Sequence, residues 1–314
     1  MKVAFHSGHL NERGSDVALY DYADLNERLL GHESIVLAPM GSELTAAERF
    51  AARFKVYLYG SAEDREAVLR QEGVDVFYAI KYGRDDGVVS RVCRTVVHCA
   101  FELGAPHGDV YAAVSEWLAE QWGGRFPWVP HVVALPEVAG DLRAELGIPR
   151  DALVLGRHGG FGEFNLPFVH EVVAEVAAAR DDVWFLFLNT APFCPPHPRI
   201  VHLPATVDVE RKVRFLNTCD AMLHARAQGE TFGLAVGEFS FQNKPVLTWA
   251  YSKDRAHIRI LKEQCLTYAG AAELRHLIAL LPATLAAGLA WDAYRVQFAP
   301  AEVMRRFAGV FLDG

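Results

Sequence analysis

The sequence has few cysteines, no excess of positive charge and no long apolar run. Thirty-one basic residues stand against thirty-nine acidic ones, a formal charge of −8, so the bulk charge offers no basic surface to nucleic acid or anionic lipid. No apolar run approaches the ~18 residues of a membrane span, and the N-terminus lacks the apolar core of a signal peptide. The five cysteines never form a C-x-x-C pair, which argues against a disulfide framework and a zinc ribbon. They are Cys93, Cys99, Cys194, Cys219 and Cys265. We therefore expect a cytoplasmic protein with reduced thiols.

The rest of the composition is that of a globular protein, with 51% hydrophobic and 22% charged residues. A length of 314 residues suggests two domains. Short apolar runs alternate with amphipathic stretches, which predicts parallel sheets covered by helices on both faces. The alternation pauses at Phe126–Pro136, which holds three prolines in eleven residues, and then restarts. Such a segment is typical of a domain boundary. Because ligands of open α/β sheets bind beyond the carboxyl ends of the strands, both halves can contact one ligand.

The most specific pattern is the segment over residues 224–238, which follows an apolar run and opens a helix. Glu230 lies just before the expected helix, and Glu238 lies on its second turn. The helix start between them offers backbone N–H groups to a phosphate. These groups belong to Thr231, Phe232 and Gly233. Because Gly233 has no Cβ, a ligand can approach the main chain closely there. Each carboxylate can accept hydrogen bonds from a sugar diol, so the layout matches the ribose, diphosphate and hexose of a nucleotide sugar.

A surface helix whose N-terminal glutamate is favoured by the helix dipole would give the same spacing. Glu238 argues against that alternative, because its neighbours make the helix mostly apolar and therefore buried. These neighbours include Leu234, Ala235, Val236 and Phe239. A buried carboxylate is costly without partners, and a bound ribose would be one.

The pattern Glu230-x-Phe232-Gly233-x4-Glu238, followed by Lys244-Pro245-Val246, resembles the E-x7-E signature of retaining GT-B glycosyltransferases of the family 4 type. Weaker matches extend the resemblance over nearly the whole chain, through residues 113–116, 146–149 and 291–311. The resemblance implies an α/β protein of GT-B architecture, with two Rossmann-like domains that face a cleft. The acceptor-side domain would span 1–136 and the nucleotide-sugar-binding domain 137–290. A C-terminal helix over 291–314 would cross back to the N-terminal domain.

The resemblance also implies a role for each matching residue. Glu238 would bind the ribose hydroxyls, and Glu230 would contact the hydroxyls of the transferred sugar. Arg157 would neutralise the leaving diphosphate, because its guanidinium is always charged and can grip phosphate with two donors. Gly14 would let the backbone of the N-terminal domain meet the diphosphate, and His98 would lie beside the sugar and the acceptor. Further backbone N–H groups for the diphosphate or sugar would come from Thr231, Phe232, Gly233 and Leu234. Glu230 and His98 are thus the expected catalytic residues.

One departure from the family pattern concerns charge. Family members usually carry a lysine a few residues after the equivalent of Arg157, and here residues 162–164 read Gly-Glu-Phe. Either Arg157 suffices or another cation assists it. The candidates are Arg13, Arg226 and Lys253. The segment after Trp249 also lacks the Gly-Gly turn that is frequent in the family, which predicts unusual donor or acceptor recognition.

Three other patterns have plainer explanations. His6 and His9 flank a glycine, but no third ligand with a suitable spacing accompanies them, so we predict no metal site. Gly159-Gly160-x-Gly162 lacks the full G-x-G-x-x-G spacing of a dinucleotide loop. His98 could instead be a hydrogen-bonded histidine at the end of a sheet strand.

The predicted function is the retaining transfer of a sugar from a UDP- or GDP-linked donor to a hydroxyl acceptor, without a cofactor. The acceptor would be a glycan, a lipid-linked molecule or a small molecule. One alternative is another GT-B activity, either an epimerase or a phosphorylase. A second is a catalytically silent subunit that binds a nucleotide sugar and scaffolds a partner. The missing lysine keeps this last alternative open, whereas the intact Glu230 and Glu238 pair argues against it.

Overall fold

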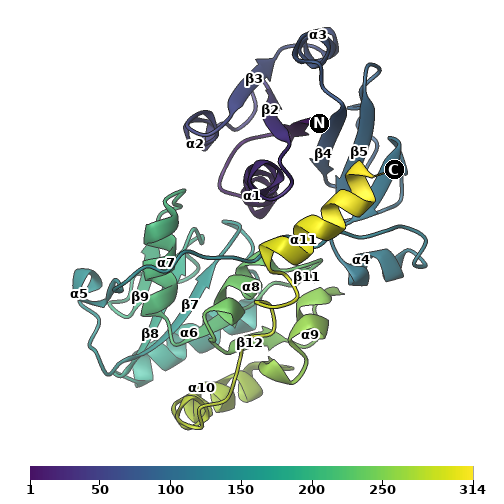
Figure 1. The fold of residues 1–314 in the computed structure, drawn as a ribbon. Coiled ribbons are helices and arrows are strands. Elements are labelled where there is room, and N and C mark those ends of the chain that lie inside the picture. The colour runs from purple at the N-terminus through teal and green to yellow at the C-terminus, as the bar shows by residue number, and fades with distance from the viewer. Residues whose placement is uncertain (314) are drawn as a thin grey trace. The chain divides into compact units, whose positions relative to one another are not determined.

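The computed structural model describes residues 1–313 and divides the chain into two compact units (Figure 1). The first unit joins Met1–Val132 to the end of the chain from Gln297, and the second comprises Val133–Val296. The first boundary therefore falls inside the proline-rich segment. Among the described residues, no helix combines the length and the apolar character needed to cross a membrane.

A six-stranded sheet with all strands parallel forms the centre of the first unit, in the order β3-β2-β1-β4-β5-β6. The strands are β1 (Lys2–His6), β2 (Glu33–Pro39), β3 (Lys55–Tyr59), β4 (Val76–Lys81), β5 (Arg94–Cys99) and β6 (Val110–Ala113). The helices are α1 (Gly14–Arg28), α2 (Ala47–Ala51), α3 (Ala62–Glu72), α4 (Glu116–Gln121) and α11 (Pro300–Phe307), which continues into a π-helical turn at Ala308–Leu312.

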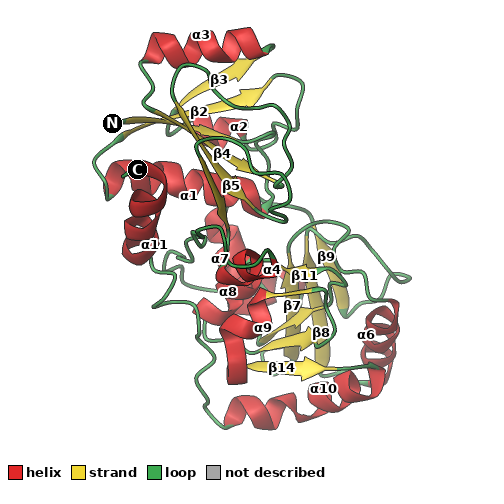
Figure 2. Ribbon diagram, turned by 90° about the vertical axis from the view of Figure 1, so that its right-hand side faces the viewer, coloured by secondary structure: helices red, strands yellow, loops and turns green. Residues whose placement is uncertain are grey.

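The second unit repeats this plan with the strand order β14-β12-β10-β7-β8-β9, again all parallel. Figure 2 shows the strands of each unit gathered into one sheet with helices around it. The strands are β7 (Leu153–His158), β8 (Val183–Leu188), β9 (Ile200–Leu203), β10 (Ala221–His224), β12 (Val246–Trp249) and β14 (Cys265–Tyr268), and β11 (Gly229–Glu230) pairs separately with β13 (Asp254–Arg255). The helices are α5 (Arg143–Leu146), α6 (Pro167–Ala179), α7 (Val209–Thr218), α8 (Leu234–Phe241), α9 (Ala256–Leu261) and α10 (Ala271–Ala286), with a 3₁₀ turn at Lys262–Gln264.

The central strands are buried because their sequences are nearly continuous apolar runs. Strand β4, with the sequence VFYAIK, is buried along its whole length, and β8, with the sequence VWFLFL, is buried at every position except Trp184. Such runs are typical of parallel strands that are covered on both faces. The prediction of two Rossmann-like α/β halves is confirmed.

In each sheet the strand order reverses beside the first strand of the unit. Strand β1 lies between β2 and β4, and β7 lies between β8 and β10. Ligands of open α/β sheets bind outside the carboxyl ends of the strands at such a reversal. In the second unit, Arg157 and His158 end β7 and His224 ends β10. Polar side chains of the sequence motif therefore lie at the edge where a ligand is expected.

The last helix of the chain packs in the first unit. The ring of Phe307 on α11 is fully buried, and its centroid lies 5.1 Å from that of Tyr22, 5.3 Å from Tyr78 and 6.2 Å from Phe5. Phe311 extends the same cluster and contacts the Phe307 ring at 5.1 Å. The last helix belongs to the first unit, as expected, but it begins at Pro300 and not at residue 291, and the residues up to Val296 belong to the second unit.

Replacing Phe307 should therefore destabilise the first unit. We expect Phe307→Ala to lower the free energy of unfolding by about 3–5 kcal/mol, since it removes a buried ring and leaves a cavity. Arg305→Ala, at a side chain 75% exposed on the same helix, should change the free energy by no more than about 0.5 kcal/mol. Urea unfolding followed by circular dichroism measures both. Equal losses in the two variants would contradict the packing of α11 against this core.

Candidate functional site

Gly233 fixes the start of the motif helix. It caps α8 with φ 89° and ψ 62°, in the left-handed region that glycine adopts without penalty. A side chain would also lack room, because a Cβ at Gly233 would lie 3.2 Å from the Cβ atoms of Glu230 and His257. The helix begins at Leu234, later than the sequence analysis placed it. The unpaired N–H groups of its first turn therefore belong to Leu234 and the two residues after it.

The two residues before this cap are buried in the loop. Phe232 is 2% exposed and Thr231 is 7% exposed. The hydroxyl of Tyr294 donates to the carbonyl of Phe232 at 3.1 Å, and the two rings pack at a centroid distance of 5.8 Å. This packing holds the loop against the end of the second unit. The ligand-binding roles expected for Thr231 and Phe232 stay predictions.

Glu238 lies on the second turn of α8 and is 4% exposed. Its Oε1 accepts a hydrogen bond from Nζ of Lys212 at 2.5 Å, and its Oε2 lies 3.0 Å from Nε2 of His158. Burial opposes ionisation, but Lys212 and His158 outweigh it and hold the pKa of Glu238 at about 2. The predicted burial of this carboxylate is confirmed, and the partners it has here are a lysine and a histidine.

Arg226 ties Glu230 to Glu163. Its Nη1 donates to Oε2 of Glu230 at 3.0 Å, and its Nε forms an ion pair with Glu163. The other oxygen of Glu230, Oε1, lies 3.2 Å from Nε2 of His224. Burial disfavours the charged form, but Arg226 and His224 together hold the pKa of Glu230 at about 2. Glu163 is one of the residues found where family members usually carry a lysine. Its ion pair with Arg226 thus orients a cation from another segment. Of the three candidate cations, Arg226 is the one paired with Glu230.

Arg157 is 5% exposed, and its hydrogen bonds within residues 1–313 go only to neutral groups. Its guanidinium donates to the hydroxyl of Thr190 at 2.6 Å, to the carbonyl of Gly160 at 2.9 Å and to the carbonyl of Asn189 at 3.3 Å. Burial lowers the pKa of Arg157 to about 10, against the effect of Glu230 and Glu163. The side chain is therefore charged at neutral pH without a carboxylate in contact. A buried cation in this state favours the binding of an anion.

The sequence analysis missed three residues that contact the two glutamates. His158 follows Arg157 at the end of β7, and His224 opens the motif segment at the end of β10, so their positions at strand ends could have identified both. Lys212 lies on α7, 26 residues before Glu238. No local pattern links these two positions, since their contact depends on how α7 and α8 pack.

His98 belongs to the core of the first unit. It has no exposed surface, its Nδ1 lies 2.6 Å from the hydroxyl of Tyr78, and its Nε2 lies 2.8 Å from the carbonyl oxygen of Val129. Burial lowers the pKa of His98 to about 4. The geometry matches the alternative of a hydrogen-bonded histidine, because β5 lies between β4 and β6 and Phe311 packs on the His98 ring at 5.2 Å. We therefore give His98 no place in the proposed mechanism.

Gly14 is the first residue of α1 and is exposed. The carboxylate of Asp16, two residues further on, is buried and accepts hydrogen bonds from the backbone N–H of Asn11 at 2.9 Å and from Nδ1 of His9 at 2.5 Å. This start of α1 thus already holds a negative charge. The diphosphate contact expected of Gly14 stays a prediction.

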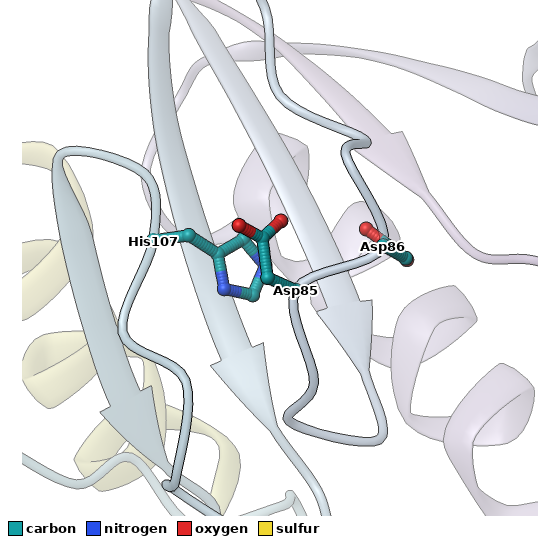
Figure 3. Close-up of side chains that lie close together, drawn as sticks. All are labelled: Asp85, Asp86 and His107. Atoms are coloured by element: carbon teal, nitrogen blue, oxygen red, sulfur yellow. The ribbon is translucent and has the colours of Figure 1, made fainter.

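Asp85, Asp86 and His107 form the one cluster with metal-ligand spacing among residues 1–313, and they lie in the first unit (Figure 3). The ammonium of Lys81 already lies among them. It donates to Oδ1 of Asp86 at 2.5 Å and to the carbonyl of Val88 at 2.7 Å, and it lies 3.0 Å from Nε2 of His107. A metal ion would have to displace this lysine, so the cluster carries no metal proposal.

Solved structures share this architecture at low sequence identity. A glycosyltransferase from Rickettsia africae is 11% identical with a TM-score of 0.70, over 100% of this chain and 99% of its own. HepE from Anabaena, crystallised with UDP and glucose, is 14% identical with a TM-score of 0.71, over 100% of both chains. The chain has the GT-B fold. A putative UDP-N-acetylglucosamine 2-epimerase from Listeria monocytogenes is 13% identical with a TM-score of 0.64, over 99% of this chain and 97% of its own. The sequence matches no protein-family model, and no curated protein is significantly similar to it.

The GT-B fold by itself does not choose among activities, because one fold hosts different chemistries. At sequence identities of 11–14%, similarity to these structures shows a shared fold and no particular activity. The activity must therefore be argued from the charged side chains around α8.

The depressed pKa of Glu238 predicts a pH dependence of stability. A carboxyl whose pKa is about 2 in the folded protein and about 4.5 when unfolded stabilises the fold fully above pH 4.5 and loses this effect as the pH falls toward 2. Between pH 6 and pH 3, the wild type should therefore lose more free energy of unfolding than Glu238→Gln, by at most about 2 kcal/mol. Urea unfolding at stepped pH measures the difference. Glu263→Gln, at an exposed carboxylate, is the control and should run parallel to the wild type. If the free energy of unfolding of Glu238→Gln fell with pH in parallel with that of the wild type, this would contradict the ion pair between Glu238 and Lys212.

Proposed function

We propose that this protein is a retaining glycosyltransferase that moves a sugar from a nucleotide-diphosphate sugar to a hydroxyl acceptor. The observation that carries the proposal is the arrangement around α8. Two carboxylates held ionised, Glu230 and Glu238, flank the start of one helix, and the buried Arg157 lies at the same edge of the sheet with no paired carboxylate in the described part of the chain. A nucleotide sugar needs such a sequence of groups, namely an acceptor for the ribose diol, donors for the diphosphate and an acceptor for the sugar hydroxyls.

Glu238 is the proposed partner of the ribose. Its carboxylate is buried, so the ribose diol would take the place of the Lys212 ammonium, which can swing away because it ends a flexible four-carbon stem. His158 would stay beside the other oxygen, 3.0 Å from its Nε2. In this proposal Lys212 keeps Glu238 charged until the nucleotide arrives.

The proposed catalytic effect is stabilisation of the leaving diphosphate. Negative charge grows on the diphosphate as the glycosidic bond breaks, and preorganised N–H dipoles and cations that meet this charge lower the barrier. The first-turn N–H groups of α8 and the guanidinium of Arg157 supply them. Arg226 adds a second cation beside Glu230, and we propose that it takes the part of the missing family lysine. In the front-face route that the family resemblance implies, a donor phosphate oxygen would take the acceptor proton.

Nucleotide binding tests the assignment of Glu238. UDP, GDP, ADP and their sugars would be compared by thermal shift, because a ligand that binds only the folded state raises the melting temperature. UDP and UDP-glucose come first in the panel, since HepE was crystallised with UDP and glucose. For the nucleotide that binds best, we expect Glu238→Ala to weaken affinity by roughly 10- to 100-fold, the loss of hydrogen bonds to a charged acceptor. Glu263→Ala is the control and should bind normally. Unchanged affinity in Glu238→Ala would rule out the ribose contact.

Turnover tests the assignment of Glu230. We expect Glu230→Gln to lower kcat by roughly 100-fold, the order of effect when one preorganised polar group is lost from a transition state. The Kd for the free nucleotide should stay within about twofold, because Glu230 is assigned to the sugar.

The anomeric configuration of the product, followed by NMR, tests retention. Epimerised sugar nucleotide, or sugar phosphate formed only with added phosphate, would favour an epimerase or a phosphorylase. Nucleotide binding with neither hydrolysis nor transfer would favour a silent binding subunit.

A further inference from the structure

Three buried polar side chains form a chain behind Glu230. Nδ1 of His224 lies 2.9 Å from Oγ1 of Thr248, and that oxygen lies 2.9 Å from Nε2 of His257. Thr248 and His257 have no exposed surface, and His224 is 4% exposed. The strand register brings the first two together, because β10 and β12 pair in parallel with His224 opposite Thr248. His257 comes from the first turn of α9.

The carboxylate at the head of this chain decides which atom carries each proton. Because the pKa of Glu230 is about 2, it can only accept, so Nε2 of His224 must donate. Nδ1 of His257 has no hydrogen-bond partner among the described residues, so the proton of that ring lies on Nε2, which donates to the oxygen of Thr248. The hydroxyl of Thr248 then donates to Nδ1 of His224. Burial lowers the pKa of His257 well below its usual value, so that ring is neutral. All three donors therefore point toward Glu230, and aligned hydrogen bonds polarise and strengthen one another.

The end of this hydrogen-bond chain that lies farthest from Glu230 is energetically unfavourable. Nδ1 of His257 is buried and has no hydrogen-bond partner among the described residues. Leaving a buried polar atom unpaired is destabilising, whereas an apolar side chain would fill the same space without this penalty. Such atoms are rare in folded proteins, and each calls for an explanation. The hydrogen bond that Nε2 of His257 donates to Thr248 provides one.

Glu230 is held from several directions at once. Arg226 donates to one carboxylate oxygen at 3.0 Å and His224 contacts the other at 3.2 Å. The Cβ and Cγ atoms of Glu230 lie so close to Gly233 that an added Cβ there would approach them to 3.2 and 3.3 Å. The hydroxyl of Tyr268 donates to the carbonyl of His224 at 2.8 Å and anchors that residue. The carboxylate therefore depends on the tautomer and orientation of the His224 ring.

We propose that His224, Thr248 and His257 are positioning residues that hold the Glu230 carboxylate in one orientation toward the hydroxyls of the transferred sugar. The ligand named here rests on the proposed function, whereas the direction of the hydrogen-bond chain does not. Thr248 is the decisive member, because its single hydroxyl proton links the two rings. Without it, the ionised Glu230 still favours the Nε2–H tautomer of His224, but Nδ1 of the ring loses its partner, and the ring is no longer held in one orientation against the carboxylate.

Thr248→Val tests the proposal, since valine keeps the shape of threonine and removes the hydroxyl. With UDP-glucose as donor, or with the donor that the binding panel selects, we expect kcat to fall roughly 10- to 100-fold, the range seen when outer hydrogen-bond partners of functional side chains are removed. The Kd for UDP should stay within about twofold. Thr248→Ser restores the hydroxyl and should restore kcat. Thr218→Val is the matched control. Thr218 is another fully buried threonine of the second unit, and it does not belong to the hydrogen-bond chain of His224, Thr248 and His257.

NMR of 15N-labelled histidine supplies a readout that does not depend on activity. In the wild type we expect His224 and His257 each as a single Nε2–H tautomer, and in Thr248→Val we expect the Nδ1 resonance of His224 to shift, because that nitrogen loses its hydrogen bond. A wild-type His224 protonated on Nδ1 would overturn the chain, and a wild-type kcat in Thr248→Val would overturn its positioning role. If the wild type turns over none of the nucleotide sugars, the proposed function fails, while the tautomers still decide whether the chain exists.

Discussion

Glu230 and Glu238 stay ionised inside the second unit because each lies against cationic or N–H-donating groups. Lys212 and His158 do this for Glu238, and Arg226 and His224 do it for Glu230. Without these partners burial would raise both pKa values and neutralise the groups. Removing one partner of such a pair also leaves the other charge buried and unpaired, which is strongly destabilising. The site and the stability of the second unit therefore rest on the same contacts.

These contacts join elements that the parallel sheet brings to one edge. Strands β7 and β10 are neighbours at the reversal of strand order, and their carboxyl ends carry Arg157 and His224. Helix α8 starts at the same edge, where Gly233 permits the turn from Glu230 into the helix. The sheet thus supplies the frame, while the chemistry comes from a few side chains at strand and helix ends. Because other activities share the frame, these side chains are what the proposed transfer reaction depends on.

The two glutamates and Arg157 could be predicted because each stands in a local pattern. The glutamates frame an apolar helix at fixed spacing, and the arginine ends an apolar strand. His98 shows a limit of such reasoning. It also lies near the end of a strand, yet β5 is covered, and both of its ring nitrogens are engaged in the core. A strand-end position does not reveal whether the layers above it leave the side chain accessible, and the start of α8 at Leu234 was likewise set by the backbone of Gly233.

By itself, the sequence determined the class of fold, the two α/β halves and the segment that carries the carboxylates, because apolar periodicity and the spacing along a helix are local properties. Only the tertiary structure decided which side chains keep those carboxylates charged. Lys212 meets Glu238 across 26 residues, Arg226 turns between Glu163 and Glu230, and His257 reaches His224 through Thr248. Contacts of this kind depend on how helices and strands pack, and packing brings together residues that no pattern in the sequence connects.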